Sequence, residues 1–394
     1  MDDSFTLETL LLHADADDDA EPGIAPPIHA SVPFSAATAE EFAELSAEPR
    51  HERFYRRYGN PTQARLERLI AEAEGAEAAL ATASGMGAVS TTLLTLLSAG
   101  DHVVAQHSMY GGTLGFLRDV APRLGIEVTF VDQADTPAFA RALRPNTRLV
   151  MLETPSNPLL RVTDLRAVAE LARDRGILTM ADNTVATPVN QRPLECGVDL
   201  VMHSVTKSLS GHSDVLAGIV AGSRELIERI WQTHILVGAV VSPYDAWLAL
   251  RGLRTLVMRV ERQNAGALAL ARFLQAHPGV AAVNHPGLPE HPQHGLAVRQ
   301  MRGFGGLLSF EPHGGREAAE RLLSALRLVR RSPSLGGYRT LAVRPAAMWA
   351  LELSDEELTE AGVPPALIRV AVGLENPDDL VADFERALAA AGAA

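Results

Sequence analysis

Cysteine is almost absent from this chain of 394 residues, and lysine is so scarce that arginine supplies most of the positive charge. The single cysteine, Cys196, excludes an intramolecular disulfide framework and any metal site built from several cysteines. No apolar run approaches the roughly 20 residues that a membrane-spanning helix needs. The acidic start, MDDSFTLETLLLHADADDD, also lacks the basic region of a secretory signal. We therefore expect a soluble cytoplasmic protein that does not associate with a membrane.

Positive charge is in deficit overall. The chain has 35 Lys and Arg residues against 48 Asp and Glu residues, which gives a formal net charge of −13. This balance argues against a nucleic-acid partner, although it leaves room for a local basic pocket that binds a small anion. Hydrophobic residues make up 47% of the chain and charged residues 21%, which is typical of globular proteins.

Strand-like and helix-like segments alternate from about residue 61 onward. Short apolar runs such as DHVVAQ, TRLVMLE, LTMADN and DLVMHSV are separated by helical stretches such as DLRAVAELARDRG. This alternation predicts an α/β fold with a mainly parallel sheet and helices on both of its faces. In such sheets, ligands bind beyond the carboxyl ends of the strands.

The pattern divides the chain into three regions. Residues 1–53 contain the proline-rich stretch EPGIAPPIHASVPF, which cannot form one long helix and predicts an extended N-terminal arm. Residues 54–248 form the predicted large domain. The stretch from about 245 to 275 predicts one long or kinked helix that leaves this domain, and residues 249–394 predict a smaller α+β domain.

Three groups that could carry chemistry follow predicted strands or begin a helix. Asp182 ends the run LTMAD, and Lys207 follows the next run, DLVMHSV, so both should lie at one edge of the sheet. The stretch SGMG places Gly85 and Met86 at a helix N-terminus, where free N–H groups and the helix dipole favour a phosphate. Lysine, a carboxylate and a phosphate seat are the groups needed to bind pyridoxal phosphate (PLP).

Each of these features also has an ordinary structural interpretation. A lysine after a strand is usually solvated, Asp182 could cap a turn, and SGMG could serve close helix packing. His203, His212 and Asp214 could suggest a metal site, but the spacing typical of metal ligands is absent. We therefore predict no metal.

A resemblance to a known family makes the PLP interpretation specific. The motifs RYGNPT, SGMGAV, MYGGT, ETPSNP, ADNT, HSVTKSLSGHSDVLAG, LGG and IRVAVGLENPDDL occur in this order. Together they resemble the Cys/Met-metabolism PLP-dependent enzymes, which include cystathionine γ-synthase, cystathionine γ-lyase, methionine γ-lyase and homoserine sulfhydrylases. The resemblance covers nearly the whole chain. It implies fold type I of the PLP-dependent transferases, with a seven-stranded sheet.

The resemblance also implies roles for individual residues. Lys207 would form the Schiff base and move protons, Asp182 would pair with the pyridine nitrogen, and Tyr110 would stack on the ring. Arg369 would hold the substrate α-carboxylate. The remaining cofactor contacts would be Gly85, Met86, Asn157, Thr184, Ser204 and Thr206, together with Tyr55 and Arg57. The last two would come from the neighbouring subunit, which implies a homo-oligomer, usually a dimer of dimers, with shared active sites.

The chain departs from the family pattern at positions tied to substrate choice. Phe54 stands where enzymes acting on cystathionine usually carry an acidic residue. Arg339 and Thr340 stand where an acidic residue and a serine are typical, and with Phe54 they are predicted to contact the substrate. Further departures are Gly112, Ser208, Arg344, Trp349 and Ala350. Arg339 prompts the hypothesis of an anionic γ-substituent, such as a succinyl or phosphoryl ester.

The sequence therefore predicts γ-elimination or γ-replacement on a γ-substituted L-amino acid, through a Cα carbanion that the cofactor stabilises. One alternative is an ordinary cystathionine γ-lyase or γ-synthase of trans-sulfuration. Another is a catalytically silent relative that acts as a binding subunit. An aminotransferase shares the lysine, the aspartate and the carboxylate-binding arginine, but the YRRYGNPT and GHSDVLAG segments favour the elimination family.

Overall fold

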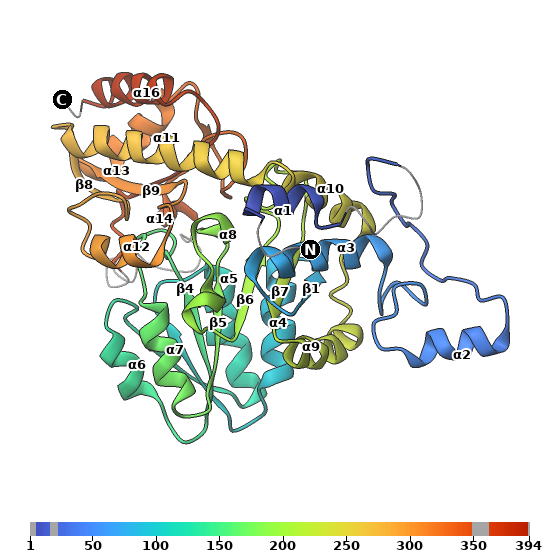
Figure 1. Ribbon diagram of the computed structural model, residues 1–394. Helices are drawn as coiled ribbons and strands as arrows, with labels where there is room; N and C mark the ends of the chain where they lie inside the picture. The colour runs from blue at the N-terminus through green and yellow to red at the C-terminus, as the bar shows by residue number, and fades with distance from the viewer. Residues whose placement is uncertain (1–4, 16–22, 349–361, 393–394) are drawn as a thin grey trace.

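The computed structural model describes residues 5–15, 23–348 and 362–392. Trp349 and Ala350, two of the departures named above, lie outside these ranges. Figure 1 shows a large sheet covered by helices, a smaller sheet with its own helices above it, and an N-terminal segment that projects to one side. The order and direction of the strands in the large sheet determine where the candidate site lies.

The large sheet contains seven strands in the order β1-β7-β6-β5-β4-β2-β3. Their bounds are β1 (Ala78–Thr82), β2 (His102–Gln106), β3 (Glu127–Val131), β4 (Thr147–Glu153), β5 (Leu178–Asp182), β6 (Leu200–Ser204) and β7 (Gly218–Gly222). Strands β2 to β6 run parallel to one another, whereas β7 is antiparallel to both β1 and β6. The predicted mainly parallel sheet is confirmed.

The sequence pattern does not predict two strands of this sheet. Strand β1 has the sequence AALAT and β7 has the sequence GIVAG, so alanine and glycine make up three of the five residues of each. Glycine in β7 has a packing reason, because a Cβ at Gly218 would lie 2.2 Å from the carbonyl oxygen of Ser84. The close approach brings β7 against the start of helix α4 (Gly85–Leu96).

Helices cover both faces of the large sheet. On one face, α4 and α9 (Arg224–Val237) pack against side chains such as Met180 and Met202. On the other face, α3 (Pro61–Glu74), α6 (Thr136–Ala142), α7 (Leu165–Arg173) and α10 (Pro243–Leu253) pack against side chains such as Ala181 and Val201. Successive strand residues thus serve opposite cores, as the alternation of side chains along a strand requires.

The predicted long or kinked helix is two helices. Helix α10 ends at Leu253, and α11 (Leu256–Ala276) begins after a short break; its first turns pack in the core of the large domain and its later turns in the core of the smaller one. The second sheet has the order β10-β11-β12-β9-β8. Its strands are β8 (Val280–Asn284), β9 (Leu307–Pro312), β10 (Arg330–Arg331), β11 (Leu341–Val343) and β12 (Ile368–Ala371), with α13 (Gly315–Ala325) and α16 (Pro377–Ala390) packed on it. The predicted smaller α+β domain is confirmed.

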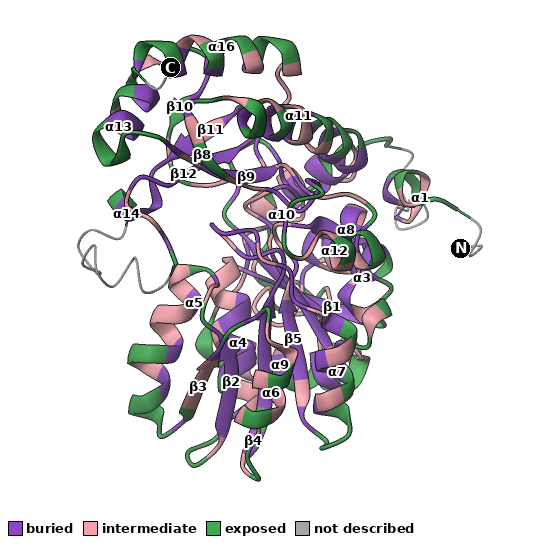
Figure 2. Ribbon diagram, turned by 90° about the vertical axis from the view of Figure 1, so that its left-hand side faces the viewer, coloured by how far each residue is buried: buried purple, intermediate pink, exposed green. Residues whose placement is uncertain are grey.

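Short helical segments complete the described chain. They are α5 (Gly111–Gly115), η2 (Phe116–Val120), η3 (Ala121–Leu124), α8 (Thr187–Asn190), η4 (Pro193–Cys196), α12 (His294–Gln300) and α14 (Pro345–Met348). Figure 2 shows α14 of the smaller domain facing α5 of the large domain. The site lies in this region.

The N-terminal region contains two short helices, α1 (Leu7–His13) and α2 (Ala39–Ala47), rather than one long one. Leu11 of α1 is buried against α3, and Asp15 accepts a hydrogen bond of 2.5 Å from Arg254. Helix α2 buries none of its residues and projects from the body of the chain (Figure 1). The start of the region is therefore anchored, and its second half extends away.

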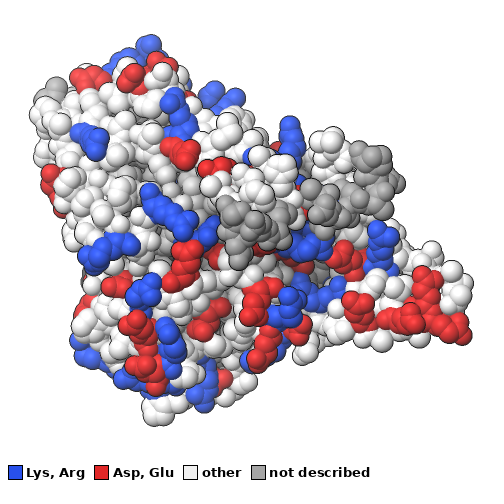
Figure 3. All heavy atoms as spheres, viewed as in Figure 1, with Lys and Arg blue, Asp and Glu red and all other residues white. Residues whose placement is uncertain are grey.

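Charged side chains of both signs are interspersed over the face drawn in Figure 3, with acidic residues gathered at the projecting tip formed by α2. Among the described residues, no helix is both long and apolar enough to cross a membrane.

Candidate active site

A deep cavity opens beyond the carboxyl ends of β4, β5 and β6. Its volume is about 1080 Å³, which is ample for a cofactor together with a substrate. The large domain supplies most of its wall, and Ser334, Leu335 and Arg369 close it from the smaller domain. The other predicted residues that line it are Gly85, Met86, Tyr110, Asn157, Asp182, Thr184, Ser204, Thr206 and Lys207.

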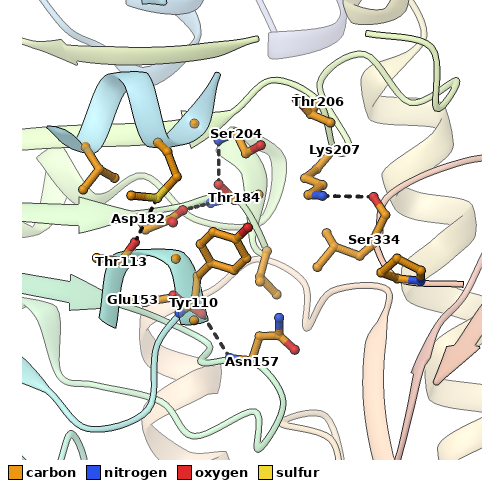
Figure 4. Close-up of a pocket in the computed structure, with 18 of the residues that line it drawn as sticks. Tyr110, Thr113, Glu153, Asn157, Asp182, Thr184, Ser204, Thr206, Lys207 and Ser334 are labelled. Carbon is orange, nitrogen blue, oxygen red and sulfur yellow. Dashed lines mark hydrogen bonds between the residues drawn. The ribbon is translucent and has the colours of Figure 1, made fainter. Parts of the chain in front are cut away.

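Lys207 is the only lysine in the sequence, and its side chain enters this cavity. Its Nζ donates a hydrogen bond of 3.0 Å to the hydroxyl of Ser334 (Figure 4). Burial lowers the pKa of the amine, and the positive charge of Arg369 lowers it further, against the opposing effect of Asp182. The amine is therefore easier to deprotonate than a solvated lysine, as a nucleophile or base must be.

Asp182 is held at the end of β5 by the residues next to it. Its carboxylate accepts a hydrogen bond of 2.9 Å from the backbone N–H of Thr184, and the Thr184 hydroxyl accepts one of 2.8 Å from the N–H of Ser204. Desolvation raises the pKa of Asp182, while hydrogen bonds from Thr184 and the nearby His203 and Lys207 oppose the rise. A buried carboxylate in this setting is well suited to an N–H cation.

Glu153, which the sequence pattern does not single out, lies beside Asp182 in the sheet. The two are directly paired on β4 and β5, so both side chains point toward the cavity. The Glu153 carboxylate accepts hydrogen bonds from the backbone N–H groups of Tyr110, at 2.6 Å, and Asn157, at 3.1 Å. Burial, together with the negative charge of Asp182, holds the pKa of Glu153 well above its usual range. Glu153 thus fixes the backbone of two predicted cofactor contacts.

The N-terminus of α4 provides an anion seat in the same wall. The Ser84 side chain caps the helix by accepting a hydrogen bond of 3.0 Å from the N–H of Gly87. Within the described chain, the N–H groups of Gly85 and Met86 have no partner. A Cβ at Gly85 would lie 3.0 Å from the Cβ of Ser204, so the absence of a side chain lets the helix end meet β6 closely.

Arg369 and Ser334 form the wall opposite the sheet. Arg369 is 4% exposed, its Nη2 donates 2.9 Å to the Ser334 carbonyl, and its Nε has no partner among the described residues. Burial lowers the pKa of Arg369 to about 10, so the guanidinium stays charged at neutral pH. Ser334, also missed by the sequence pattern, has φ = 88°, an unusual backbone conformation for a residue other than glycine. A buried guanidinium with a free donor suits a carboxylate ligand.

Two departures from the family pattern have a packing explanation. A Cβ at Gly112 would lie 2.6 Å from Cε1 of Tyr110, so the tyrosine ring occupies the space that a larger residue would need. Ser208 is 5% exposed, and a Cβ at Gly336 would lie 2.3 Å from its hydroxyl oxygen. An aromatic residue at 208 would push the Ser334 loop away from the site.

Five predicted residues do not line this cavity in the single chain. Phe54 packs edge-to-face with Phe42 and Tyr58, each at 5.7 Å between ring centres. Tyr55 is 39% exposed, and Arg57 donates a hydrogen bond of 2.6 Å to the Ile235 carbonyl. Arg339 is exposed, with its guanidinium over the ring of Tyr338. Thr340 is fully buried, and its hydroxyl donates a hydrogen bond of 2.7 Å to Glu375. The geometry gives Thr340 a structural role, because its hydroxyl is already used in folding the smaller domain.

Across the described ranges, no group of three or more His, Cys, Asp or Glu side chains could hold a metal ion. The cavity instead offers a nucleophilic amine, a carboxylate for a ring nitrogen, an anion seat and a carboxylate-binding arginine. Each of these groups fits one part of PLP or of an amino acid. Fold and site therefore define a PLP-dependent enzyme of fold type I.

Comparison with known proteins identifies the family. Residues 8–389 match the family described as Cys/Met metabolism PLP-dependent enzymes, and the chain belongs to that family. It is 44% identical over 369 residues to an L-methionine γ-lyase of Pseudomonas putida, covering 93% of each chain. It is also 44% identical over 336 residues to an O-succinylhomoserine sulfhydrylase of Pseudomonas aeruginosa, covering 85% of this chain and 83% of that one.

A solved structure shows the same fold. The cystathionine γ-synthase of Xanthomonas oryzae pv. oryzae, determined with aminoacrylate and cysteine, superposes with a TM-score of 0.94 at 38% identity. The comparison covers 99% of both chains. The predicted family and the predicted cofactor are both confirmed.

Proposed function

We propose that this chain uses Lys207, Tyr110 and Arg369 to remove or replace the γ-substituent of an L-amino acid. The observation that carries the proposal is the placement of the only lysine between the carboxylate of Asp182 and the guanidinium of Arg369, in one cavity. The lyase, sulfhydrylase and synthase names of the relatives support chemistry at a C–S or C–O bond. A cytoplasmic location stays a prediction from the sequence.

Each of the residues that line the cavity would have its own role in such a reaction. Bound PLP supplies an electron sink for the electron pair that remains when a proton leaves the substrate Cα. Arg369 holds the α-carboxylate and so fixes which bond at Cα faces Lys207. The depressed pKa of Lys207 lets its free amine accept that proton near neutral pH and later deliver it. Tyr110 stands over the same space with its backbone fixed by Glu153.

A substrate panel tests the proposal. The PLP-loaded protein is incubated with cystathionine, methionine, cysteine, and the acetyl, succinyl and phosphoryl esters of homoserine, with and without an added thiol. Elimination releases ammonia and 2-oxobutanoate, and replacement yields a thioether, which mass spectrometry separates. No product from any compound would instead support a catalytically silent binding subunit. A keto acid formed in equal amount to the substrate without ammonia would indicate an aminotransferase.

We further propose that the active site is completed by a second copy of the chain, in a dimer or a dimer of dimers. Tyr55 and Arg57 do not reach the cavity of their own chain; Tyr55 is 39% exposed, and Arg57 donates to the Ile235 carbonyl at the end of α9. Both residues are suited to binding phosphate, by a hydroxyl and a guanidinium.

Mixed oligomers test this sharing. Arg57→Ala and Lys207→Ala chains are each expected to be inactive alone, but co-expression should restore activity, because one site of the mixed dimer then has both residues intact. The tagged mixed oligomer is isolated and its turnover measured against each parent. If the mixed oligomer is as inactive as its parents, Arg57 does not act across the subunit boundary.

We propose that a different arginine from the predicted one faces the γ-substituent of the substrate. Arg339 lies outside the cavity, whereas Arg118 of η2 lines it and is exposed, and its side chain makes no hydrogen bond or ion pair with any described residue. Arg118 and Tyr110 both line the cavity. We therefore propose that Arg118, rather than Arg339, would bind an anionic γ-substituent.

We expect Arg118→Ala to lower kcat/KM for O-succinylhomoserine about two- to fivefold, the size of an exposed charge pair, and to leave O-acetylhomoserine unaffected. The difference should shrink in high salt, since the charge is open to solvent. Arg339→Ala is the matched control, because it removes an exposed arginine that does not line the cavity. Equal effects of the two variants on both esters would contradict a charge-selective role for Arg118.

A further inference from the structure

A buried polar cluster lies on the opposite face of the large sheet from the cavity. It consists of Glu74, Asn183, Gln191 and His203, whose exposed fractions are 0, 0, 2 and 1%. Oε1 of Glu74 accepts a hydrogen bond of 2.6 Å from Nε2 of His203 and one of 3.0 Å from the Asn183 amide. The Asn183 amide also donates 2.8 Å to the Gln191 carbonyl. None of these residues lines the cavity.

Strand geometry places this cluster next to Asp182. Asp182 on β5 is directly paired with Met202 on β6, and both side chains line the cavity. Because side chains alternate along a strand, the next residues, Asn183 and His203, point through to the other face. There they meet Glu74, the last residue of α3. Only the thickness of the sheet separates His203 from Asp182.

If Glu74 is ionised, its buried negative charge needs a positive charge close by. A buried carboxylate without a counter-charge is costly, and His203 is the one side chain of the cluster that can become positive. Its Nε2 already bonds to Glu74, so the second proton would reside on Nδ1, which has no partner among the described residues. Oε2 of Glu74 is likewise buried and without a partner. Buried polar atoms left unpaired in this way are rare, and they call for a functional explanation.

Several charged groups act on Asp182. The loss of water around Asp182 opposes its ionisation. A positive charge on His203 or on Lys207 favours ionisation and lowers the pKa of Asp182, and the two side chains lie on opposite sides of the sheet. Because the charge of Lys207 would change when its amine reacts, a protonated His203 would be the more constant source of positive charge near Asp182.

We propose that Glu74 and His203 form a buried ion pair that keeps Asp182 ionised, and thereby strengthens its hold on the protonated pyridine nitrogen of PLP. Both act as positioning residues, since neither lines the cavity. The inference rests on the cofactor role of Asp182 in the proposed function. The competing explanation is that the pair only ties α3 to the sheet, as a neutral hydrogen bond would.

Cofactor affinity distinguishes the two explanations. Apoprotein of the wild type and of His203→Gln is titrated with PLP and with its 1-deaza analogue, in which carbon replaces the pyridine nitrogen. Glutamine retains a donor for Glu74 and removes the charge. We expect the Kd for PLP to rise about tenfold, as for the loss of one charge across a sheet, and the Kd for the analogue to stay unchanged. Glu74→Gln should reproduce this pattern if His203→Gln folds poorly.

A matched control is His285→Gln, which removes another fully buried histidine, bonded to backbone groups in the smaller domain. It should leave both affinities unchanged. Equal weakening of PLP and the analogue in the His203 variant, or weakening of neither, would overturn the proposal. If the wild type itself binds both cofactors equally well, the role of Asp182 fails first, and the proposal fails with it.

Discussion

Replacement of Lys207 by alanine is expected to lower kcat at least about 10³-fold, because it removes the group that transfers protons at the reacting carbon. It should also leave PLP bound without a covalent link, since no other lysine exists in the chain to replace it. Borohydride reduction followed by peptide mass spectrometry measures the link directly. In the wild type, the mass of reduced cofactor should appear on the one peptide that contains residue 207.

The single lysine makes this experiment unusually clean. In most proteins PLP also attaches to surface lysines, whereas here the N-terminal amine is the only other primary amine of the chain. Lys207→Arg serves as the control, because it keeps a positive charge near Asp182 but cannot form the imine. Substantial turnover by either variant, or cofactor attached at the N-terminus alone in the wild type, would show that Lys207 is not the catalytic amine.

Arg369→Ala is expected to reduce kcat/KM about 10²- to 10³-fold. The buried guanidinium has a free Nε and can offer a carboxylate two charge-assisted hydrogen bonds, each contributing about 1.5 to 3 kcal/mol. Loss of about 3 to 4 kcal/mol corresponds to that decrease in rate. Steady-state kinetics with a γ-substituted amino acid provides the measurement. Binding of PLP to the apoprotein should change little, since Arg369 serves the substrate.

A second consequence of Arg369→Ala concerns Lys207. The positive charge of Arg369 lowers the pKa of that amine, so its removal should raise the pKa. The pH at which the apoprotein begins to form the imine with PLP should therefore move upward. Arg369→Lys keeps a charge but loses the planar fork, so it should retain the normal pH midpoint and still lose part of the kcat/KM. An unchanged midpoint in the alanine variant would contradict this coupling.

The sequence predicted the parts of the fold that depend on short runs of apolar residues followed by polar ones. The buried parallel strands are rich in Val, Leu and Met, and they end in polar residues such as Asp182 and Ser204. These ends could be located without a structure, and the resemblance to a known family added Tyr110 and Arg369. The strands β1 and β7 were missed because alanine and glycine carry little strand signal, and β7 is defined by close backbone contact with the start of α4.

The residues that support the site were harder to find. Glu153 looks like the end of one more strand, and its importance lies in two backbone N–H bonds to Tyr110 and Asn157. Ser334 lies far along the chain, and only tertiary packing brings it to Lys207. Conversely, Arg339 looked well suited to a substrate anion, but the turn of the loop directs it outward, over Tyr338. Contacts between distant segments carry no local pattern, so the sequence could not show them.

Ser334 contacts both the proposed catalytic amine and the proposed carboxylate-binding arginine. Its hydroxyl accepts a hydrogen bond from Lys207, and its carbonyl accepts one from Arg369. The residue belongs to the smaller domain, whereas Lys207 belongs to the large one. Any tilt of one domain against the other therefore alters the environment of the amine and the reach of the guanidinium together. The packing of the smaller domain on the large one therefore sets the surroundings of the catalytic amine and the position of the carboxylate-binding guanidinium together.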